Sequence, residues 1–279
     1  MPDVHFMPFP YRYRCPFGVG GDDCHRISSA YIERAIKDPN GGITPPAGMI
    51  LEPVQGEGGA IPAPDAWLRE IRRITQEQGI PLIVDEIQTG FGRTGAMFAF
   101  EHAGIVPDVL LLSKAIGGGL PLSVVVYNAD LDRWAPGAHA GTFRGNQLAM
   151  ATGHATMEFI REQRLDLHAA SMGERLLGHL STLGRSARCV GDVRGRGLMV
   201  GVEIVERDAP PDASGARPAS PSMARRIQAE ALERGLILEL GGRSDTVVRL
   251  LPPLIVSAEQ VDLIATILEA AVVAAERGT

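Results

Sequence analysis

The fold class is indicated most directly by one stretch, Pro81-Leu82-Ile83-Val84-Asp85-Glu86-Ile87-Gln88-Thr89-Gly90. Its first four residues form a short apolar run, which is typical of a parallel strand that is covered on both faces. The polar residues that follow predict a turn at the end of this strand. Val109–Leu112 and Val124–Tyr127 repeat the apolar type. Because helical patterns and glycine-rich loops separate these runs, the sequence predicts an α/β domain with a mostly parallel sheet.

Apolar spacing and cap residues predict the elements around this sheet. One helix is expected to begin at Asp65 as its N-cap and to end before Gly79, with an apolar face at helical spacing. The other elements expected in this part of the chain are a loop (1–25), a strand (49–51) and helices (27–36, 146–160 and 165–183).

The pattern changes after residue 160. Strands are expected at Leu198–Val205, Leu236–Leu240 and Val247–Leu251, and the last helix carries a capping box of Ser257 and Gln260. The sequence therefore predicts a large domain over residues 1–160 and a smaller α+β domain over residues 161–279.

Composition excludes several classes of function. A formal net charge of −6 and only 5% aromatic residues disfavour a nucleic-acid binder. No apolar run approaches the roughly 18–20 residues of a membrane span, so no membrane partner is expected. The three cysteines are sparse and odd in number, which favours a reducing, cytoplasmic compartment, and Cys15 and Cys24 lack the spacing of a zinc site. We expect no bound metal.

Lys114 follows the apolar run Val109–Leu112 and is itself followed by Gly117–Gly119. A single lysine in such a loop is ordinarily a surface charge. The alternative is a lysine held in a dry crevice, where burial lowers the pKa of its amine and makes it nucleophilic. Asp85 ends a neighbouring strand. Pyridoxal phosphate needs a lysine for its Schiff base and a carboxylate at its pyridine nitrogen, so this pair favours a site for that cofactor.

Three blocks of sequence carry a family resemblance, namely residues 85–95, 107–108 and 113–121. Their order and spacing resemble the class-III (ω-amino acid) aminotransferases, which use pyridoxal phosphate and have fold type I. Residues 52–59, 141–146 and 193–199 resemble further blocks of that family, so the resemblance covers essentially the whole chain. It implies an aspartate-aminotransferase-like large domain, incomplete at its N-terminus, followed by a small C-terminal domain.

The resemblance implies a role for each matching residue. Lys114 is expected to form the Schiff base with pyridoxal phosphate and to move a proton between the substrate carbon and the cofactor. Asp85 is expected to pair with the pyridinium nitrogen, and Gln88 to lie by the ring oxygen. Thr142 is expected to bind the cofactor phosphate of a partner subunit, which implies a homodimer with shared active sites.

Glu57 and Arg249 resemble the family's gate pair. In such a pair the glutamate covers the arginine while an ω-amine donor is bound, and it moves away when the carboxylate of glutamate or 2-oxoglutarate arrives. Arginine suits this task because its guanidinium binds a carboxylate through two hydrogen bonds. Without the resemblance, Arg249 would be interpreted as a surface charge at a strand end.

Within the family, residues 9–18, 98–104, 139–147 and 235–243 are most similar to diaminobutyrate–2-oxoglutarate aminotransferases. These enzymes interconvert diaminobutyrate and 2-oxoglutarate with aspartate semialdehyde and glutamate. The alternatives are an ornithine, acetylornithine or 4-aminobutyrate aminotransferase. A racemase or aminomutase that uses the same cofactor, or an inactive remnant or subunit, also stays open.

The chain departs from the family at its start. Residues 1–50 contain no Ser-Gly-Thr-like run of the kind that holds the cofactor phosphate at a helix N-terminus. We therefore expect the chain to correspond to the C-terminal two-thirds of such an enzyme, and to bind pyridoxal phosphate weakly when it is alone.

Overall fold

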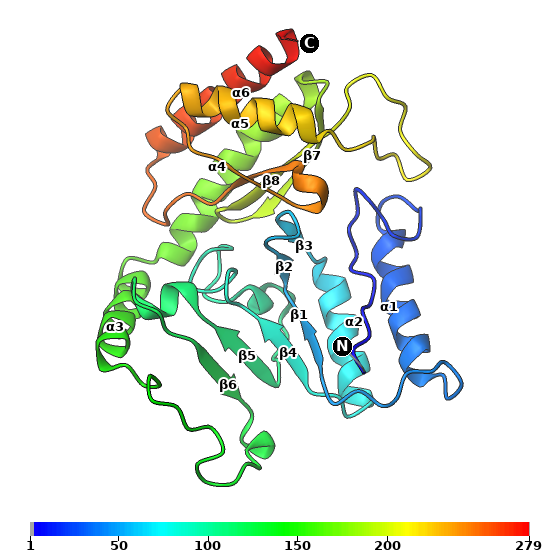
Figure 1. The fold of residues 1–279 in the computed structure, drawn as a ribbon, viewed down its shortest axis with the longest axis vertical. Helices are drawn as coiled ribbons and strands as arrows, with labels where there is room; N and C mark the ends of the chain where they lie inside the picture. Colours follow the sequence, from blue (N-terminus) through cyan, green and yellow to red (C-terminus); the bar gives the residue numbers. More distant parts are fainter. Residues whose placement is uncertain (1–2, 279) are drawn as a thin grey trace.

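The computed structural model describes residues 3–278, which form two sheets with helices packed against them (Figure 1). The first sheet has the strand order β1-β4-β5-β6. Its strands are β1 (Met49–Leu51), β4 (Leu82–Asp85), β5 (Val109–Leu112) and β6 (Val124–Tyr127). The first three run parallel, which confirms the predicted α/β class with a mostly parallel sheet.

Strand β6 departs from the prediction because it pairs antiparallel with β5. Its apolar run resembles a strand covered on both faces, but Val125 and Val126 are 53% and 50% exposed. An edge strand with one partner is covered less fully than a central strand, and apolar composition alone does not distinguish the two.

Two helices flank the first sheet on the side of β1 (Figure 1). They are α1 (Asp23–Lys37) and α2 (Asp65–Glu77), so the first helix begins four residues before its predicted start. The prediction of Asp65 as an N-cap is wrong, because Pro64 occupies that position. Asp65 lies in the first turn and its carboxylate accepts a hydrogen bond of 2.8 Å from Arg196 in the second sheet. The Asp65 carboxylate therefore takes part in a tertiary ion pair and not in a local helix cap.

Short elements lie between the strands of the first sheet and directly after its last strand. A two-stranded ribbon is formed by β2 (Val54–Gln55) and β3 (Ile61–Pro62). Single 3₁₀ turns are formed by η1 (Ala99–Ala103), η2 (Lys114–Gly117) and η3 (Ala129–Leu131). The long helices α3 (Gln147–Glu162) and α4 (Leu165–Ser186) then lead to the second sheet, and both confirm their predicted positions.

The second sheet is entirely antiparallel, with the strand order β7-β8-β10-β9. Its strands are β7 (Val190–Arg196), β8 (Met199–Ile204), β9 (Glu239–Gly241) and β10 (Val247–Leu250). The strand expected at Leu236–Leu240 corresponds to β9, which begins three residues later, at Glu239, and ends at Gly241. Strand β7 was not predicted, because glycine and charged residues interrupt its apolar pattern.

Helices α4 and α5 (Pro221–Glu233) pack against the second sheet, and α6 (Ala258–Arg277) packs against these two helices (Figure 1). The short turn η4 (Arg243–Asp245) precedes β10. The predicted capping box of α6 is confirmed. Ser257 Oγ accepts a hydrogen bond from the Gln260 N–H, and Gln260 Oε1 accepts one from the Ser257 N–H.

Each sheet has its own apolar core. Leu82, Val84 and Leu110 belong to the first, while Val248 and Leu250 belong to the second. The division of the chain at residue 160 stays a prediction. Among residues 3–278, no helix is both long and apolar enough to cross a membrane.

Candidate active site

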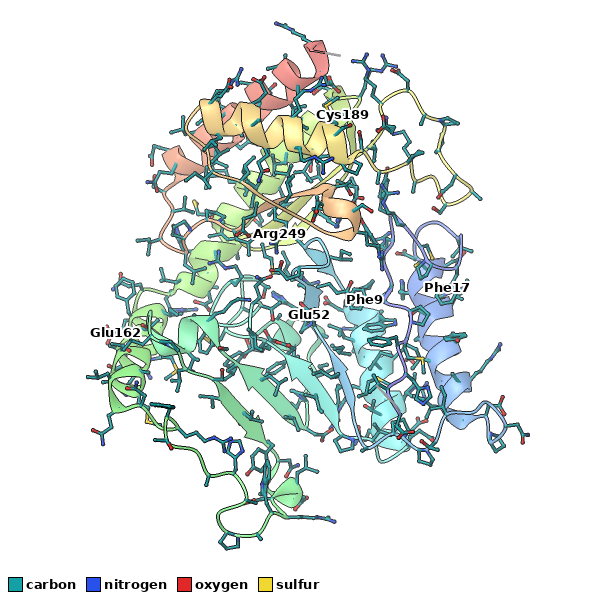
Figure 2. The ribbon with its side chains drawn as sticks, in the orientation of Figure 1. Phe9, Phe17, Glu52, Glu162, Cys189 and Arg249 are labelled. Atoms are coloured by element: carbon teal, nitrogen blue, oxygen red, sulfur yellow. The ribbon has the colours of Figure 1, made fainter. Side chains whose placement is uncertain are left out.

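The candidate site lies where the loop after β1 meets the second sheet. Figure 2 labels Glu52 and Arg249 on the two sides of this junction. The loop over residues 52–59 ends against β7, β8 and β10. The Gly242 N–H donates to the Glu57 carbonyl oxygen at 2.9 Å, and Arg194 donates to the Gly59 carbonyl oxygen at 2.8 Å. The loop is therefore fixed by hydrogen bonds from the second sheet.

Asp85 and Lys114 lie at the same edge of the first sheet. Strands β4 and β5 are parallel neighbours, and Asp85 is opposite Leu111, three residues before Lys114. Asp85 Oδ1 accepts a hydrogen bond of 2.9 Å from the Ile87 N–H. Its other oxygen has no hydrogen-bond partner among residues 3–278. The carboxyl ends of parallel strands are where ligands bind in open α/β sheets.

Lys114 has two unusual properties. Its φ of 51° lies in the left-handed region, where non-glycine residues are uncommon. This backbone conformation costs roughly 1 kcal/mol or more. Its ammonium group forms no ion pair with any residue that the structure describes. The side chain is exposed, which differs from the dry crevice expected from the sequence. In this chain, the amine is accessible rather than enclosed.

Helix α3 supports the turn that carries Lys114. A Cβ atom built on Gly153 would overlap the carbonyl oxygen of Ile116, so only glycine permits this close approach. Thr152 Oγ1 also donates to the Gly117 carbonyl oxygen at 2.8 Å. The position of the η2 turn therefore depends on direct contact with α3.

Glu57 and Arg249, the two residues of the predicted gate pair, form an ion pair. Arg249 Nη1 donates to Glu57 Oε1 at 2.8 Å. The arginine side chain is 5% exposed, whereas that of the glutamate is 76% exposed. The hydrogen bond from Arg249 lowers the pKa of Glu57 below its usual value. A charged glutamate therefore covers a buried guanidinium.

Gln88 connects this ion pair to the turn that follows Asp85. Its Nε2 donates to Glu57 Oε1 at 3.3 Å, so one oxygen of Glu57 accepts from both Gln88 and Arg249. The Oε1 atom of Gln88 is buried and has no hydrogen-bond partner among the described residues. A buried acceptor without a partner is rare in folded proteins. This one lies against Gly56, since a Cβ atom built there would be 1.8 Å from it.

Glu52 is a further carboxylate at this edge that the sequence did not single out. Its Oε2 accepts a hydrogen bond of 2.8 Å from the Gly56 N–H. Burial raises the pKa of Glu52, and the negative charges of Asp85 and Glu57 act in the same direction. Lys114 lowers it, so these four charges lie within electrostatic reach of one another.

Arg93 joins the turn that follows β4 to the second half of the chain. Its Nη1 donates to the carbonyl oxygens of Leu198 at 3.2 Å and of Pro252 at 2.5 Å. Its own carbonyl oxygen accepts from the Leu198 N–H at 2.9 Å. Burial lowers the pKa of Arg93 to about 10, and no carboxylate pairs with it among the described residues. Pro252 follows Arg249 by three residues, so Arg93 fixes the Asp85 turn relative to β10.

A buried charge cluster anchors the loop from the other side. Arg194 donates to Gly59, to Asp192 and to Glu203 Oε2, the last at 2.9 Å. Tyr11 donates to the same oxygen of Glu203, and Arg14 donates to Oε1 at 2.7 Å. The N-terminal segment, the loop and the second sheet therefore meet at one carboxylate, whose side chain is only 2% exposed.

Thr142 does not join the other predicted site residues. It is exposed and lies in the segment between β6 and α3. Figure 1 shows this segment extending from the first sheet on the side away from the second sheet. The structure thus brings Glu57, Gln88 and Arg249 into contact. Asp85 and Lys114 lie at the ends of neighbouring parallel strands. Thr142 lies outside this group.

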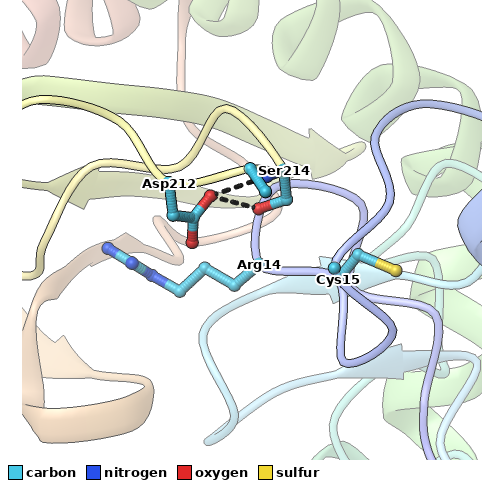
Figure 3. A pocket seen from close by; sticks show the side chains of 6 residues that line it. Arg14, Cys15, Asp212 and Ser214 are labelled. Atoms are coloured by element: carbon cyan, nitrogen blue, oxygen red, sulfur yellow. Dashed lines mark hydrogen bonds between the residues drawn. The ribbon is translucent and has the colours of Figure 1, made fainter.

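A separate cavity of about 360 Å³ is lined by Arg14, Cys15, Gly18 and residues 212–214 (Figure 3). Asp212 Oδ1 accepts hydrogen bonds from both the backbone and the hydroxyl group of Ser214. Arg14 already binds Glu203 and the carbonyl oxygen of Arg217. Arg14 Nη2 is buried without a hydrogen-bond partner among the described residues, but none of the predicted site residues lines this cavity. Within residues 3–278, no cluster of His, Cys, Asp or Glu is arranged to hold a metal ion.

Sequence reasoning missed Glu239, Arg93 and Arg194. Glu239 is directly opposite Arg249 in the β9–β10 pair, and its Oε2 accepts from Arg249 Nη2 at 3.0 Å. No local pattern identifies such residues, because each acts through a partner that is distant in the chain or set by strand register. Together, the site offers an accessible amine, several carboxylates and a buried guanidinium. These groups suit proton transfer and the recognition of a substrate carboxylate.

Comparison with known proteins gives consistent results. The aminotransferase class-III family matches residues 1–272. A diaminobutyrate–2-oxoglutarate aminotransferase of Rhizobium meliloti is 56% identical over 271 residues, which are 97% of this chain and 58% of that protein. The enzyme of the same name in Haemophilus influenzae is 49% identical over 251 residues, 90% of this chain and 55% of that protein.

Solved structures include an amine transaminase from an uncultivated Pseudomonas species with pyridoxal phosphate bound. It superposes with a TM-score of 0.89 at 29% identity, covering 99% of this chain and 62% of that one. This likeness confirms the predicted fold type I. The chain spans somewhat more than half the length of the curated relatives it matches.

Proposed function

The chain belongs to the class-III aminotransferase family, and from this membership we propose that it carries the reaction centre of a pyridoxal-phosphate-dependent aminotransferase. The proposed reaction transfers the ω-amino group of L-2,4-diaminobutyrate to 2-oxoglutarate and gives aspartate semialdehyde and glutamate, or runs in reverse. The names of the two curated relatives support this substrate pair. The observation that carries the proposal is the Glu57–Arg249 ion pair beside the sheet edge of Asp85 and Lys114.

The residues at the junction fit pyridoxal phosphate. The Lys114 amine has no ion-pair partner and one Asp85 oxygen has no hydrogen bond, among the described residues. Gln88 Oε1 is buried without a partner. When bound, pyridoxal phosphate supplies a ring that withdraws electrons from the substrate carbon.

Lys114 and Asp85 have complementary tasks in this proposal. Lys114 Nζ takes the proton from the substrate carbon that bears the amine, and later returns a proton during the transfer. Asp85 would hold the ring nitrogen in its protonated form, because an adjacent carboxylate favours the charged form of that nitrogen. Gln88 orients the ring through its amide group.

Glu57 and Arg249 select between the two substrates. Arg249 lowers the pKa of Glu57, so Glu57 is charged at neutral pH and neutralises the guanidinium while the amine donor is bound. The carboxylate of 2-oxoglutarate then replaces Glu57 on Arg249. Since the Glu57 side chain is largely exposed, it can turn into solvent at little cost.

We further propose a homodimer in which Thr142 serves the partner's cofactor phosphate. Support comes from exposed apolar side chains around Thr142. Phe143 is 94% exposed and Leu148 is 70% exposed, and Trp134 and Met150 are each more than half exposed. Large exposed apolar side chains that are close together in the sequence are common at protein interfaces. Sedimentation of the chain should give a dimer, and Phe143→Asp together with Leu148→Asp should give a monomer.

A cytoplasmic location is the proposed compartment. Cys15, Cys24 and Cys189 are all buried free thiols, a pattern that is usual in a reducing environment.

The proposed reaction is tested by incubating the purified chain with pyridoxal phosphate, diaminobutyrate and 2-oxoglutarate, and measuring glutamate. We expect glutamate to form only when all three compounds are present, and Lys114→Ala to abolish it. Binding is followed separately through the absorbance band that a lysine-bound cofactor gives near the visible edge. Product formation without a 2-oxo acid would instead favour a racemase or aminomutase. Cofactor binding without any turnover would favour an inactive subunit.

A further inference from the structure

Arg249 has a second carboxylate partner in addition to Glu57. Its Nη2 donates to Glu239 Oε2 at 3.0 Å, while its Nη1 donates to Glu57 Oε1 at 2.8 Å. Both terminal nitrogens of the guanidinium are therefore engaged by carboxylates from two different parts of the chain.

Strand register places Glu239 at this position. In β10, Val248 and Leu250 belong to the core of the second sheet, so Arg249 faces the opposite side, toward the loop over residues 52–59. Glu239 is paired directly with Arg249 in the antiparallel β9–β10 ladder, and such pairs have side chains on the same face. The carboxylate is thus presented to Arg249 by the sheet itself.

The remaining sides of the guanidinium are closed. A Cβ atom built on Gly241 would lie 2.5 Å from Arg249 Nε, so the side chain of Arg249 occupies space that glycine leaves open. Nε is buried and has no hydrogen-bond partner among the described residues. An incoming carboxylate therefore reaches Arg249 from the side where Glu57 and Glu239 lie.

The geometry limits what Glu57 can do alone. When Glu57 turns away, Nη1 loses its carboxylate and keeps only its longer contact of 3.4 Å with the Gly56 carbonyl oxygen, while Nη2 stays bound to Glu239. A carboxylate that binds both terminal nitrogens, the arrangement that makes arginine effective, needs both positions. Like Glu57, Glu239 has a largely exposed side chain, at 73%, so it can also rotate into solvent.

We propose that Glu239 is a second masking carboxylate, and that a 2-oxo acid gains Arg249 only when both Glu57 and Glu239 release it. Glu239 thereby sets how readily the site accepts a dicarboxylate oxo acid relative to an ω-amine donor. This inference rests on the proposed function, because it concerns the substrate specificity of the same site.

The kinetic test uses Glu239→Gln, which keeps the size of the side chain and removes its charge. The KM for 2-oxoglutarate should fall about two- to fivefold, the range expected for an exposed ion pair. The KM for the amine donor should stay unchanged or rise, because Arg249 is then less completely neutralised. An unchanged or raised KM for 2-oxoglutarate would overturn the proposal, since it would mean that Glu239 does not compete. Glu233→Gln, at the exposed end of α5, controls for the general loss of one negative charge.

A binding measurement separates this inference from the proposed function. The ¹⁵N–¹H signal of Arg249 Nε, assigned by its loss in Arg249→Lys, is followed while glutarate is added to the cofactor-free chain. Glu239→Gln and Glu57→Gln should each tighten glutarate binding about two- to fivefold, and the double variant should tighten it further. Tightening in a chain without aminotransferase activity would leave the inference standing and reject the function. Equal affinity in all variants, or no saturable shift in any of them, would reject the inference.

Discussion

Glu57 and Arg249 are separated by 192 positions in the sequence, yet Glu57 Oε1 and Arg249 Nη1 lie 2.8 Å apart. The contact spans the junction between the two sheets, because Glu57 follows the short strand β2 and Arg249 belongs to β10. Every hydrogen bond that fixes the loop over residues 52–59 against the second sheet therefore also fixes this ion pair. The candidate site depends on how the two halves of the chain are held together.

Asp85→Asn should lower kcat by about 100-fold or more, the usual loss when one charge-stabilising group is removed from an active site. The amide oxygen of asparagine can still accept the hydrogen bond from the Ile87 N–H, so the Tm should change little. Steady-state kinetics and thermal denaturation of the same preparation check both expectations. A large fall in Tm would show that Asp85 acts on the fold rather than on the cofactor.

Gly153→Ala should displace the η2 turn that carries Lys114. The added methyl group overlaps the carbonyl oxygen of Ile116, so we expect a loss of about 1–3 kcal/mol in the free energy of unfolding. Cofactor binding, followed by absorbance, should weaken as well. Gly178→Ala in α4 is the matched control, because nothing lies within 4 Å of the added atom. It should stabilise the chain by about 0.5–1 kcal/mol. Equal effects of the two changes would contradict the proposed support by α3.

Arg93→Met should lower the free energy of unfolding by about 2–4 kcal/mol. The change removes charge-assisted hydrogen bonds to Leu198 and Pro252 and leaves their carbonyl oxygens without this donor. Arg93→Lys keeps the charge but not the planar group, and should recover part of the loss. Urea denaturation measures both variants. A neutral effect of Arg93→Met would mean that the cost of burying the charge cancels the hydrogen bonds.

Glu86 should make stability depend on pH. It is completely buried, accepts hydrogen bonds from Thr89 Oγ1 and the Phe100 N–H, and has a pKa that burial raises. A raised pKa in the folded state means that its stabilising contribution is fully present below about pH 4.5, the value in the unfolded chain, and is lost as the pH rises through the folded-state pKa.

Glu86→Gln removes this titration. The difference in Tm between the variant and the parent should therefore move in favour of the variant as the pH rises from 4 to 8. Thermal denaturation across that range measures the difference, and a difference that does not depend on pH would contradict the assigned cause.

The sequence predicted local features better than contacts. Strand β5 was predicted with its observed limits, because a short apolar run between polar turns permits few alternatives. The Ser257 capping box was also predicted, since both partners lie within one turn. Asp65 was predicted wrongly as a cap because its actual partner, Arg196, is 131 positions away.

For the site, too, local features were predicted better than contacts. Motif spacing placed Asp85 and Lys114 on neighbouring strands, and their roles stay predictions. The contact of Glu239 with Arg249 depends on the register of β9 and β10, which no residue pattern in either strand specifies. The exposure of Lys114 could not be predicted either, because enclosure depends on what packs over the sheet edge.

Tracing the transferred nitrogen tests the proposed amino-group transfer directly. The chain is incubated with pyridoxal phosphate, 2-oxoglutarate and L-2,4-diaminobutyrate carrying ¹⁵N at either the 4-amino or the 2-amino group, and the glutamate formed is analysed by mass spectrometry. Glutamate should gain one mass unit from the 4-labelled donor and none from the 2-labelled donor. Label arriving from the 2-amino group, or no labelled glutamate from either donor, would contradict the proposed transfer.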